Sequence, residues 1–324
     1  SMTLSSRGLL VGGSFASVGG QPRSNLAALD VATGRATNWK PRTNPEGEVS
    51  ALAVNGSTVY AGGSFSTILR PGGGSDPRKN LAAFDATTGA LRSWRADAAT
   101  PVRSLAASST VVYAGGSYPP LTNPSESRLY TFDAQSGVPL GWQPDVPITG
   151  GINALELVGQ TLVVASGPLG EDDPGLAALD AVGLAARWVR PEVVSAFNVD
   201  LDASRVYASY TTDFTVARLV AMDLATGAVQ PWAATIRGRT TQPIVWAVRA
   251  VGPDVFVGGV FEEINGVSRI NVGAVDAQRG AVVRDWRPRV NGFVRVMEAR
   301  SALFLGGEFT SVNNFDQTGV AAFE

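Results

Sequence analysis

Short apolar segments separated by turn residues recur along the whole chain. One segment has the form apolar-apolar-x-Gly-Gly-x-Phe, and its first glycine, or the equivalent residue, lies at positions 12, 62, 115, 166, 209, 258 and 306. The copies at 166 and 209 are weaker because serine replaces this glycine. A spacing of 43 to 53 residues is typical of the blades of a β-propeller.

Two further segments accompany each Gly-Gly segment. A Val-x-Ala-Leu run precedes it, as at residues 49–54, and a Leu-Ala-Ala-Leu-Asp-x-x-Thr-Gly-x-x-x-x-Trp segment follows it, as at residues 26–39. All are rich in β-branched and aromatic residues, and no stretch keeps a helical period over ten residues. They predict four strands per repeat: a is the Val-x-Ala-Leu run, b ends in Gly-Gly, c is Leu-Ala-Ala-Leu-Asp, and d ends in Trp.

These repeats predict an all-β fold, a seven-bladed β-propeller of four-stranded antiparallel blades that forms a single domain over residues 1–324. The seven b strands are expected near residues 9–13, 58–63, 111–116, 161–166, 205–210, 254–259 and 302–307. The last copy stops at residues 320–324, so the last blade lacks its outer strand in this chain. Three possibilities stay open: that edge is open, it is covered, or the chain belongs to a longer protein.

The residues that recur in every repeat are interpreted as scaffold. The aspartate of Asp-x-x-Thr-Gly is expected to accept hydrogen bonds from the turn, where the glycine takes the left-handed conformation. Six of the seven tryptophans belong to the repeat. Each is expected to bury roughly 150 to 250 Å² between adjacent sheets.

The composition excludes several kinds of chemistry. The chain has no cysteine and no histidine, which rules out thiolate nucleophiles, Ser-His-Asp triads and the usual zinc sites. With 26 basic and 28 acidic residues, the net charge of -2 gives no electrostatic reason to bind nucleic acid. No stretch approaches the roughly 18 apolar residues of a membrane-spanning helix, so no membrane insertion is expected.

The repeat resembles bacterial β-propeller repeats of the delta-60 type, which read Gly-Gly-x-Phe-x-x-x-x-Gly followed by Asn-Leu-Ala-x-Leu-Asp. Residues 12–30 and 258–276 match this pattern closely, including Asn25 and Asn271. The resemblance spans nearly the whole chain. It implies a propeller in a secreted or cell-surface bacterial protein, and it implies no defined activity.

The Asp-x-x-Thr-Gly-x-x-x-x-Trp segment is also similar to the tryptophan-docking motif of quinone-dependent dehydrogenase propellers, which is one residue shorter between Gly and Trp. Those enzymes have eight blades and a dedicated cofactor site. No residue set of this chain matches that site. The likeness therefore indicates shared blade packing, and no cofactor is expected.

Function is sought where equivalent positions differ between repeats and carry polar groups. The second residue of strand a meets this condition, and strand a is expected to be innermost, with its start near one mouth of the central channel. The residues at this position are Ser50, Arg103, Asn153, Asn198, Trp246 and Arg295. They are interpreted as a ligand-binding ring; the alternative is a solvated channel lining with internal salt bridges to Glu156 or Glu298.

Loops with insertions are the second candidate region, because binding residues concentrate on loops of rigid scaffolds. These loops are residues 69–79, 119–127, 170–174 and 234–243. Two acidic groups are candidates for a Ca²⁺ site: Glu171, Asp172 and Asp173, or Asp200 and Asp202 together with Asn198. The alternative for both is a solvated acidic cluster or turn, since the regular Ca²⁺-loop spacing is absent.

Three functions fit these observations. The first is a non-catalytic extracellular binding propeller that presents its loop-rich face and channel mouth to a protein, peptide or glycan. The second is a carbohydrate-active hydrolase or lyase that works through carboxylates on that face. The third is a structural spacer within a larger surface protein. The lack of histidine and of a convergent carboxylate pair favours the first and third.

Overall fold

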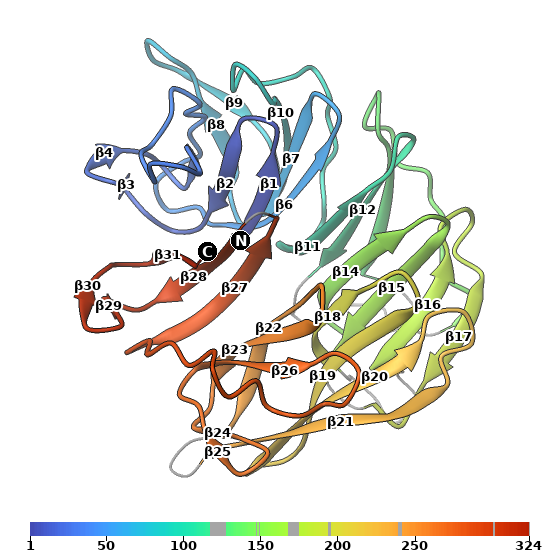
Figure 1. Ribbon diagram of the computed structural model, residues 1–324. Coiled ribbons are helices and arrows are strands. Elements are labelled where there is room, and N and C mark those ends of the chain that lie inside the picture. Colours follow the sequence, from blue (N-terminus) through green and yellow to red (C-terminus); the bar gives the residue numbers. More distant parts are fainter. Residues whose placement is uncertain are drawn as a thin grey trace. The chain divides into compact units, whose positions relative to one another are not determined.

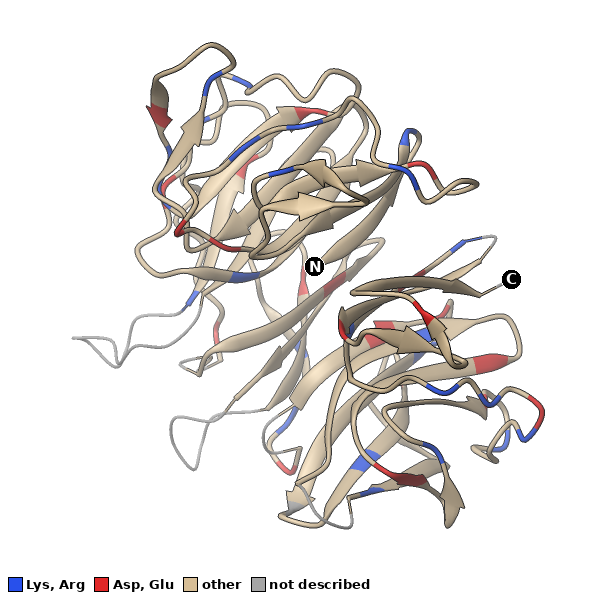
Figure 2. Cartoon of the chain, turned by 90° about the vertical axis from the view of Figure 1, so that its left-hand side faces the viewer, with Lys and Arg blue, Asp and Glu red and all other residues tan. Residues whose placement is uncertain are grey.

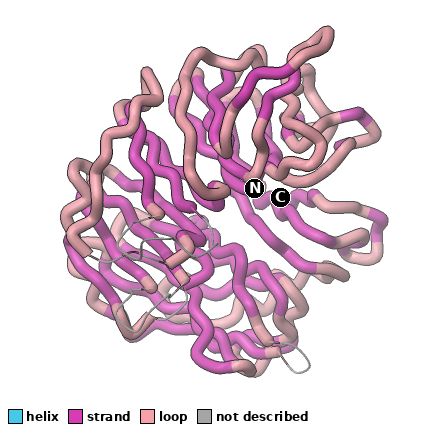
Figure 3. The backbone as a smooth tube through the Cα atoms, turned by 180° about the vertical axis from the view of Figure 1, so that it is seen from behind, coloured by secondary structure: helices cyan, strands magenta, loops and turns pink. Residues whose placement is uncertain are grey.

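The computed structural model describes residues 1–116, 128–146, 148, 150–167, 175–193, 196–238, 242–300 and 302–323. The chain divides into two compact units, Ser1–Leu157 and Val158–Glu324, and each is described by itself. The described residues form strands, turns and loops without a helix (Figure 3), which confirms the all-β class. They accordingly include no helix with the length and apolar character needed to cross a membrane.

In the first unit, three repeats each form an antiparallel sheet with strands a, b and c in that order (Figure 1). The strands, sheet by sheet, are β1 (Met2–Ser5), β2 (Gly8–Gly12) and β5 (Leu26–Leu29); β6 (Val49–Asn55), β7 (Thr58–Gly63) and β10 (Leu81–Asp85); β11 (Val102–Ala107), β12 (Val111–Gly116) and β13 (Leu129–Asp133). The next strand a is β14 (Ile152–Val158), and the division between the units falls near its end.

The second unit repeats the same antiparallel order. Its strands are β15 (Thr161–Ser166), β16 (Leu176–Asp180) and β17 (Ala186–Arg190); β18 (Ala196–Leu201), β19 (Arg205–Asp213), β20 (Val216–Asp223) and β21 (Val229–Arg237); β22 (Ile244–Val251), β23 (Asp254–Val260) and β26 (Val272–Asp276); β27 (Phe293–Ala299), β28 (Leu303–Glu308) and β31 (Val320–Phe323). Acidic and basic residues are interspersed within each unit (Figure 2).

The predicted strand d is regular in only two of the described repeats, where it forms β17 and β21. In four others it makes one antiparallel bridge to strand c and then leaves the sheet. These bridges are Leu29–Ala36, Phe84–Leu91, Phe132–Pro139 and Val275–Val282. In three of the four segments a proline, which has no N–H for the ladder, lies in the bridge or shortly after it: Pro41, Pro139 and Pro288.

Four small hairpins between strands b and c were not predicted. They are β3 (Ser17–Val18) with β4 (Gln21–Pro22), β8 (Thr67–Leu69) with β9 (Ser75–Pro77), β24 (Glu263–Ile264) with β25 (Val267–Ser268), and β29 (Ser311–Val312) with β30 (Phe315–Asp316). The asparagine of the repeat motif follows three of them with a positive φ, as in Asn25 at 66°. The Nδ2 of Asn25 donates to the carbonyl of Gly47 at 2.8 Å, so this residue ties the loop to the chain that leads into the next sheet.

The two glycines of the Gly-Gly segment permit two different close approaches. A Cβ on Gly62 would lie 2.5 Å from Cγ1 of Val102 in the next sheet, so only glycine lets the sheets pack this closely. A Cβ on Gly63 would lie 1.8 Å from the carbonyl oxygen of Glu48. That carbonyl lies beside a β-bulge at the start of strand a, where the register shifts between Val49 and Ala51. The second glycine therefore accommodates the bulge.

Candidate binding site on the bulged strands

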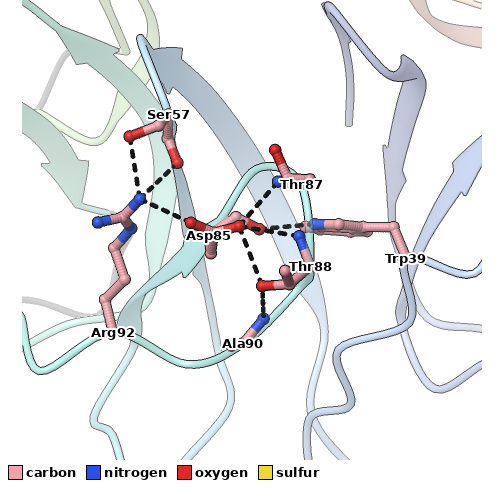
Figure 4. A network of polar contacts seen from close by, with 7 residues as sticks. All are labelled: Trp39, Ser57, Asp85, Thr87, Thr88, Ala90 and Arg92. Carbon is pink, nitrogen blue, oxygen red and sulfur yellow. Dashed lines mark hydrogen bonds and ion pairs between the residues drawn. The ribbon is translucent and has the colours of Figure 1, made fainter.

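The recurring aspartates close the hairpins after strand c. The Oδ1 of Asp85 accepts hydrogen bonds from the N–H groups of Thr87 and Thr88 at 3.0 and 2.8 Å, and from the Thr88 hydroxyl at 3.0 Å (Figure 4). Asp30, Asp133, Asp223 and Asp276 likewise accept from the N–H three residues on. The hydrogen bonds from Thr88 hold the pKa of Asp85 below its usual value. The series is structural, as the sequence indicates.

The recurring tryptophans join neighbouring repeats. The indole N–H of Trp39 donates to the backbone carbonyl of Asp85, in the next sheet, at 3.0 Å (Figure 4). Trp94, Trp188 and Trp232 donate to the carbonyls of Asp133, Leu224 and Asp276 at 2.9 to 3.0 Å. All four rings are buried. The tryptophans and the hairpin aspartates therefore form one repeated scaffold contact.

The candidate position at the start of strand a is the residue projected by the β-bulge. Register shifts place Ser50, Arg103, Trp246 and Arg295 at the bulge of their strands. In β18 the shift lies between Ala196 and Asn198, so Phe197 is the equivalent residue. The prediction that Asn198 belongs to this series was wrong by one residue, because the strand begins at Ala196, one residue earlier than the sequence indicates, and Asn198 pairs with Ser209 after the bulge. Asn198 instead accepts a 3.0 Å bond from the Val248 N–H through Oδ1.

Trp246 and Arg295 lie on neighbouring strands β22 and β27 and contact each other. The guanidinium carbon of Arg295 is 3.9 Å from the centroid of the Trp246 ring. The ring of Phe293 meets the indole edge to face, with centroids 5.8 Å apart and an interplanar angle of 64°. The Nε and Nη2 of Arg295 both donate to Oε1 of Glu308, at 3.0 and 2.7 Å. These four residues are called the Trp246 cluster.

The Trp246 cluster is open to solvent. Phe293 is 39% exposed, and the side chains of Arg295 and Glu308 are 46% and 61% exposed. A guanidinium stacked on an indole has a fixed orientation, and it can still donate hydrogen bonds from its edge. The cluster therefore offers an aromatic surface beside an oriented cation.

The sequence did not single out Phe293 and Glu308, although one signal was present for Glu308. It occupies the position after Gly-Gly, where the other strong copies have Ser14, Ser64, Ser117 and Val260. Phe293 lies just before the Val-x-Ala-Leu pattern and has no such signal. The remaining predicted residues lie in the first unit, where Arg103 on β11 is exposed and Ser50 on β6 and Asn153 on β14 are half-buried.

The internal salt bridge of the second unit joins Arg249 to two carboxylates and does not include Arg295. Arg249 donates to Oδ1 of Asp200 at 3.2 Å and to Oε1 of Glu298 at 2.6 Å. Asp200 and Glu298 are mostly buried, and that desolvation raises the pKa of both carboxyls despite the nearby guanidinium. These two carboxylates come from different sheets and converge on one cation.

The residues of one predicted Ca²⁺ site bind protein donors. Asp200 also accepts from the Ala250 N–H, at 2.6 Å, in addition to Arg249. Asp202 accepts from the N–H groups of Ser204 and Arg205 through Oδ1, and from the Tyr207 hydroxyl through Oδ2 at 2.9 Å. Within the described ranges, no group of three or more acidic side chains is placed to hold a metal ion. Glu171, Asp172 and Asp173 lie outside the described residues.

Of the four loops with insertions, one is fully described. Residues 69–79 run from the last residue of β8 through β9, and an ion pair joins Arg70, just after β8, to Asp76 on β9. Residues 119–127 and 170–174 lie outside the described residues. The segment 234–243 begins in β21 and is described up to residue 238 and from residue 242.

Comparison with protein families gives the chain its affiliation. The family described as outer membrane protein assembly factor BamB matches residues 1–140 and 77–318, which together cover nearly the whole chain. The chain belongs to this family. The sequence resembles two groups of propellers, and this family match supports the resemblance to quinoprotein-type blades. No curated protein sequence matches the chain.

Several solved structures share the fold. BamB from Moraxella catarrhalis has 16% sequence identity and a TM-score of 0.52, with 99% of this chain and 92% of that chain covered. Hydrazine synthase from Kuenenia stuttgartiensis has 12% identity and a TM-score of 0.62, with coverage of 99% and 94%. The computationally designed Ika8 protein has 13% identity and a TM-score of 0.59, also with coverage of 99% and 94%. At these identities the likeness extends to the fold alone, and it confirms the β-propeller class.

Proposed function

We propose that this BamB-family chain is a non-catalytic binding propeller of the bacterial envelope, located outside the cytoplasm, which binds a segment of a protein partner through the Trp246 cluster. The family description, an assembly factor for outer membrane proteins, supports a role in binding other proteins in the envelope. The partner segment is expected to present an apolar side chain to Trp246 and Phe293, and a carboxylate or backbone carbonyl to Arg295.

The observation that carries this proposal is the stacking of Arg295 on Trp246 at two bulge positions. Tryptophan and arginine are the residues most enriched at the energetic centres of protein interfaces. The Nε and Nη2 of Arg295 are held by Glu308, and Nη1 has no hydrogen-bond partner among the described residues. Because the indole and Glu308 already fix the guanidinium, little side-chain entropy is lost when a ligand binds.

The hydrolase or lyase alternative receives no support from the described carboxylates. Asp200 and Glu298 both pair with the single cation Arg249, and both are largely removed from solvent. A glycosidase needs one carboxylic acid and one carboxylate flanking an accessible bond. A glycan ligand without hydrolysis is the remaining competitor, since an indole face also stacks on sugars.

The test is affinity capture from a solubilised bacterial envelope fraction with three immobilised chains: wild type, Trp246→Ala combined with Arg295→Ala, and the control Phe214→Ala. Phe214 is an exposed aromatic residue of the turn between β19 and β20, 81% exposed, and it does not belong to the cluster. Wild type and control should retain the same protein. The double variant should lose it, with a dissociation constant raised about 30-fold or more.

Two outcomes would contradict the proposal. One is the same retained protein on all three chains. The other is a glycan, and no protein, that raises the melting temperature of wild type and of Phe214→Ala but not of the double variant, because a ligand that binds the folded state raises its apparent stability.

A further inference from the structure

Two aliphatic side chains face the strand that supplies Phe293 and Arg295 to the Trp246 cluster. Ile244, two residues before the tryptophan on β22, lies directly opposite Val260 on β23, and both are half-buried. Gly258 shows which way this pair faces, because a Cβ on it would lie 2.5 Å from Cγ1 of Val294 in β27. Side chains alternate between the two faces of a sheet, so Val260 faces β27 as well, and Ile244 shares its face.

The corresponding positions of a first-unit repeat are polar. Glu48 and Ser64 stand where Ile244 and Val260 stand in the second unit, and the N–H of Glu48 donates to the hydroxyl of Ser64 at 3.2 Å. The bulge lies at Ser50 in that repeat, in the same place on the strand. Because polar residues are compatible with the same bulged blade, the apolar pair beside Trp246 is a local feature and not a requirement of the scaffold.

The charged half of the Trp246 cluster has no net charge and has unused hydrogen-bonding groups. Both hydrogen bonds from Arg295 end on Oε1 of Glu308. Oε2 of Glu308 accepts from no described residue, and this side chain is 61% exposed. Nη1 of Arg295 likewise donates to no described residue. The pair therefore offers a ligand one donor group and one acceptor.

This combination fits a backbone amide better than a carboxylate. A carboxylate at Nη1 would share the guanidinium with Glu308, whose charge already compensates that of Arg295, and it would add repulsion between like charges. In an extended segment, the N–H and the C=O of one residue point to the same side. The C=O can accept from Nη1 while the N–H donates to Oε2, so both unused groups gain a partner without a second charge.

We propose that the Trp246 cluster, together with Ile244 and Val260, binds an extended, apolar and uncharged segment of a protein partner and reads its backbone through Arg295 and Glu308. This inference rests on the proposed function and specifies the ligand of that site. Val260 and Glu308 are its specificity-determining residues. Val260 selects an apolar side chain, and Glu308 selects an amide over an acid.

The probe is a phage-displayed library of random peptides, selected on the immobilised wild-type chain and depleted on the Trp246→Ala, Arg295→Ala double variant. Enriched peptides should be rich in Leu, Ile, Val and Phe and poor in Asp and Glu. Peptides with an acidic residue at a fixed position would overturn this inference and leave the proposed function standing. A library in which no peptide distinguishes the two chains would contradict both.

Glu308→Gln distinguishes an amide ligand from an acid by the sign of its effect. Glutamine keeps an oxygen to which Arg295 can donate, but it places an NH₂ group where Oε2 was and leaves the guanidinium charge uncompensated. Binding of a backbone N–H should therefore weaken about fivefold or more, whereas a carboxylate ligand would bind more tightly. The measurement is fluorescence anisotropy of the most enriched peptide, labelled with fluorescein and capped at both ends. Unchanged or tighter binding would overturn the inference.

Val260→Ser tests the apolar half with the same peptide. Serine removes the aliphatic surface but is the residue found at the equivalent position 64, so the blade should fold. Binding should weaken about fivefold or more, because the buried apolar area is lost. Val229→Ser is the matched control, since Val229 on β21 is 55% exposed and outside the cluster, and it should bind as wild type. Equal affinity of Val260→Ser and this control would overturn the role given to Val260.

Discussion

The indole nitrogen of Trp94 donates a 3.0 Å hydrogen bond to the backbone carbonyl of Asp133, a residue that closes the c–d hairpin of the next sheet with its side chain. One aspartate therefore serves two purposes at once. Its carboxylate orders the turn, and its carbonyl receives the tryptophan of the preceding repeat. The contact couples each hairpin to its neighbour through a partly buried hydrogen bond.

Removing the indole N–H while keeping an aromatic ring tests this coupling. Trp94→Phe leaves the carbonyl of Asp133 without its donor, and the expected loss is about 1 to 3 kcal/mol of the free energy of unfolding. Trp94→Ala also removes the buried ring, and about 3 to 5 kcal/mol is expected. Chemical denaturation gives both values. Trp286→Phe is the matched control, because Trp286 is half-buried and its substitution should lower the free energy of unfolding by less. Equal losses at Trp94 and Trp286 would argue against the coupling.

The hairpin glycines separate a conformational effect from a packing effect. Gly34 and Gly137 both have positive φ, 67° and 82°, but a Cβ has open space at Gly34 and lies 2.4 Å from the carbonyl of Arg95 at Gly137. Gly34→Ala should therefore cost only the left-handed backbone, about 1 to 2 kcal/mol. Gly137→Ala should cost more by about 1 to 3 kcal/mol because the neighbouring repeat must move. The melting temperatures of the two variants give the comparison. Similar decreases in melting temperature would contradict a close contact between Gly137 and the neighbouring repeat.

The turn aspartates make stability depend on pH. Hydrogen bonds from Thr88 and its neighbour hold the pKa of Asp85 below its usual value, so its contribution is present above the unfolded pKa and is lost as pH falls through the folded pKa. Asp85→Asn keeps an acceptor for the turn but removes the charge. The variant should be less stable than wild type at pH 7, and the gap should close as pH is lowered toward 3. A difference in the free energy of unfolding between the two chains that stays constant from pH 7 to pH 3 would contradict the assignment.

The carboxyls paired with Arg249 are expected to contribute to wild-type stability with the opposite pH dependence. Burial raises the pKa of Asp200 and Glu298, so the stability from these carboxyls is present at low pH and is lost as pH rises through their raised pKa values. Arg249→Met leaves both carboxylates without their cation and should cost about 3 to 5 kcal/mol at pH 7. The cost should shrink at pH 4.5, where the carboxyls are more protonated.

The control for that variant is Arg187→Met, because Arg187 pairs with the exposed Asp180 at 2.8 Å. Surface pairs of this kind contribute up to about 1 kcal/mol. Denaturant titrations at both pH values are the measurement. A loss at Arg249 no larger than that at Arg187, or one independent of pH, would refute the role given to the buried pair.

The features that could be predicted from the sequence are those set by neighbouring residues. The Asp-x-x-Thr-Gly hairpin needs only its own side chains and one left-handed glycine, so this turn could be predicted from the sequence wherever the motif occurs. The Gly-Gly pair likewise marks strand b. The break of strand d after one bridge was not predicted, since it depends on where the tryptophan must reach the next sheet.

The site could be predicted only in part, because its geometry depends on register and on long-range contacts. Comparing repeats identified Trp246 and Arg295, but nothing in the sequence says that they stack on each other. The same comparison misplaced Asn198, since one residue of register decides whether a side chain is at the bulge or in the ladder. Arg249 was missed because the comparison stopped at the second position of strand a; at the fifth position it stands beside Asp200 and Glu298.

The central claim is that the recurring residues hold the fold while the Trp246 cluster binds the partner. It is tested most directly by measuring, in the same preparations, the free energy of unfolding and the affinity for the captured partner. Trp246→Ala with Arg295→Ala should lower stability by only about 1 to 2 kcal/mol, since a partly exposed stack and a surface ion pair are lost, and should raise Kd about 30-fold or more. Trp94→Phe should show the reverse pattern, with weakened folding and unchanged affinity. Unchanged affinity in the double variant, or its failure to fold, would contradict the account.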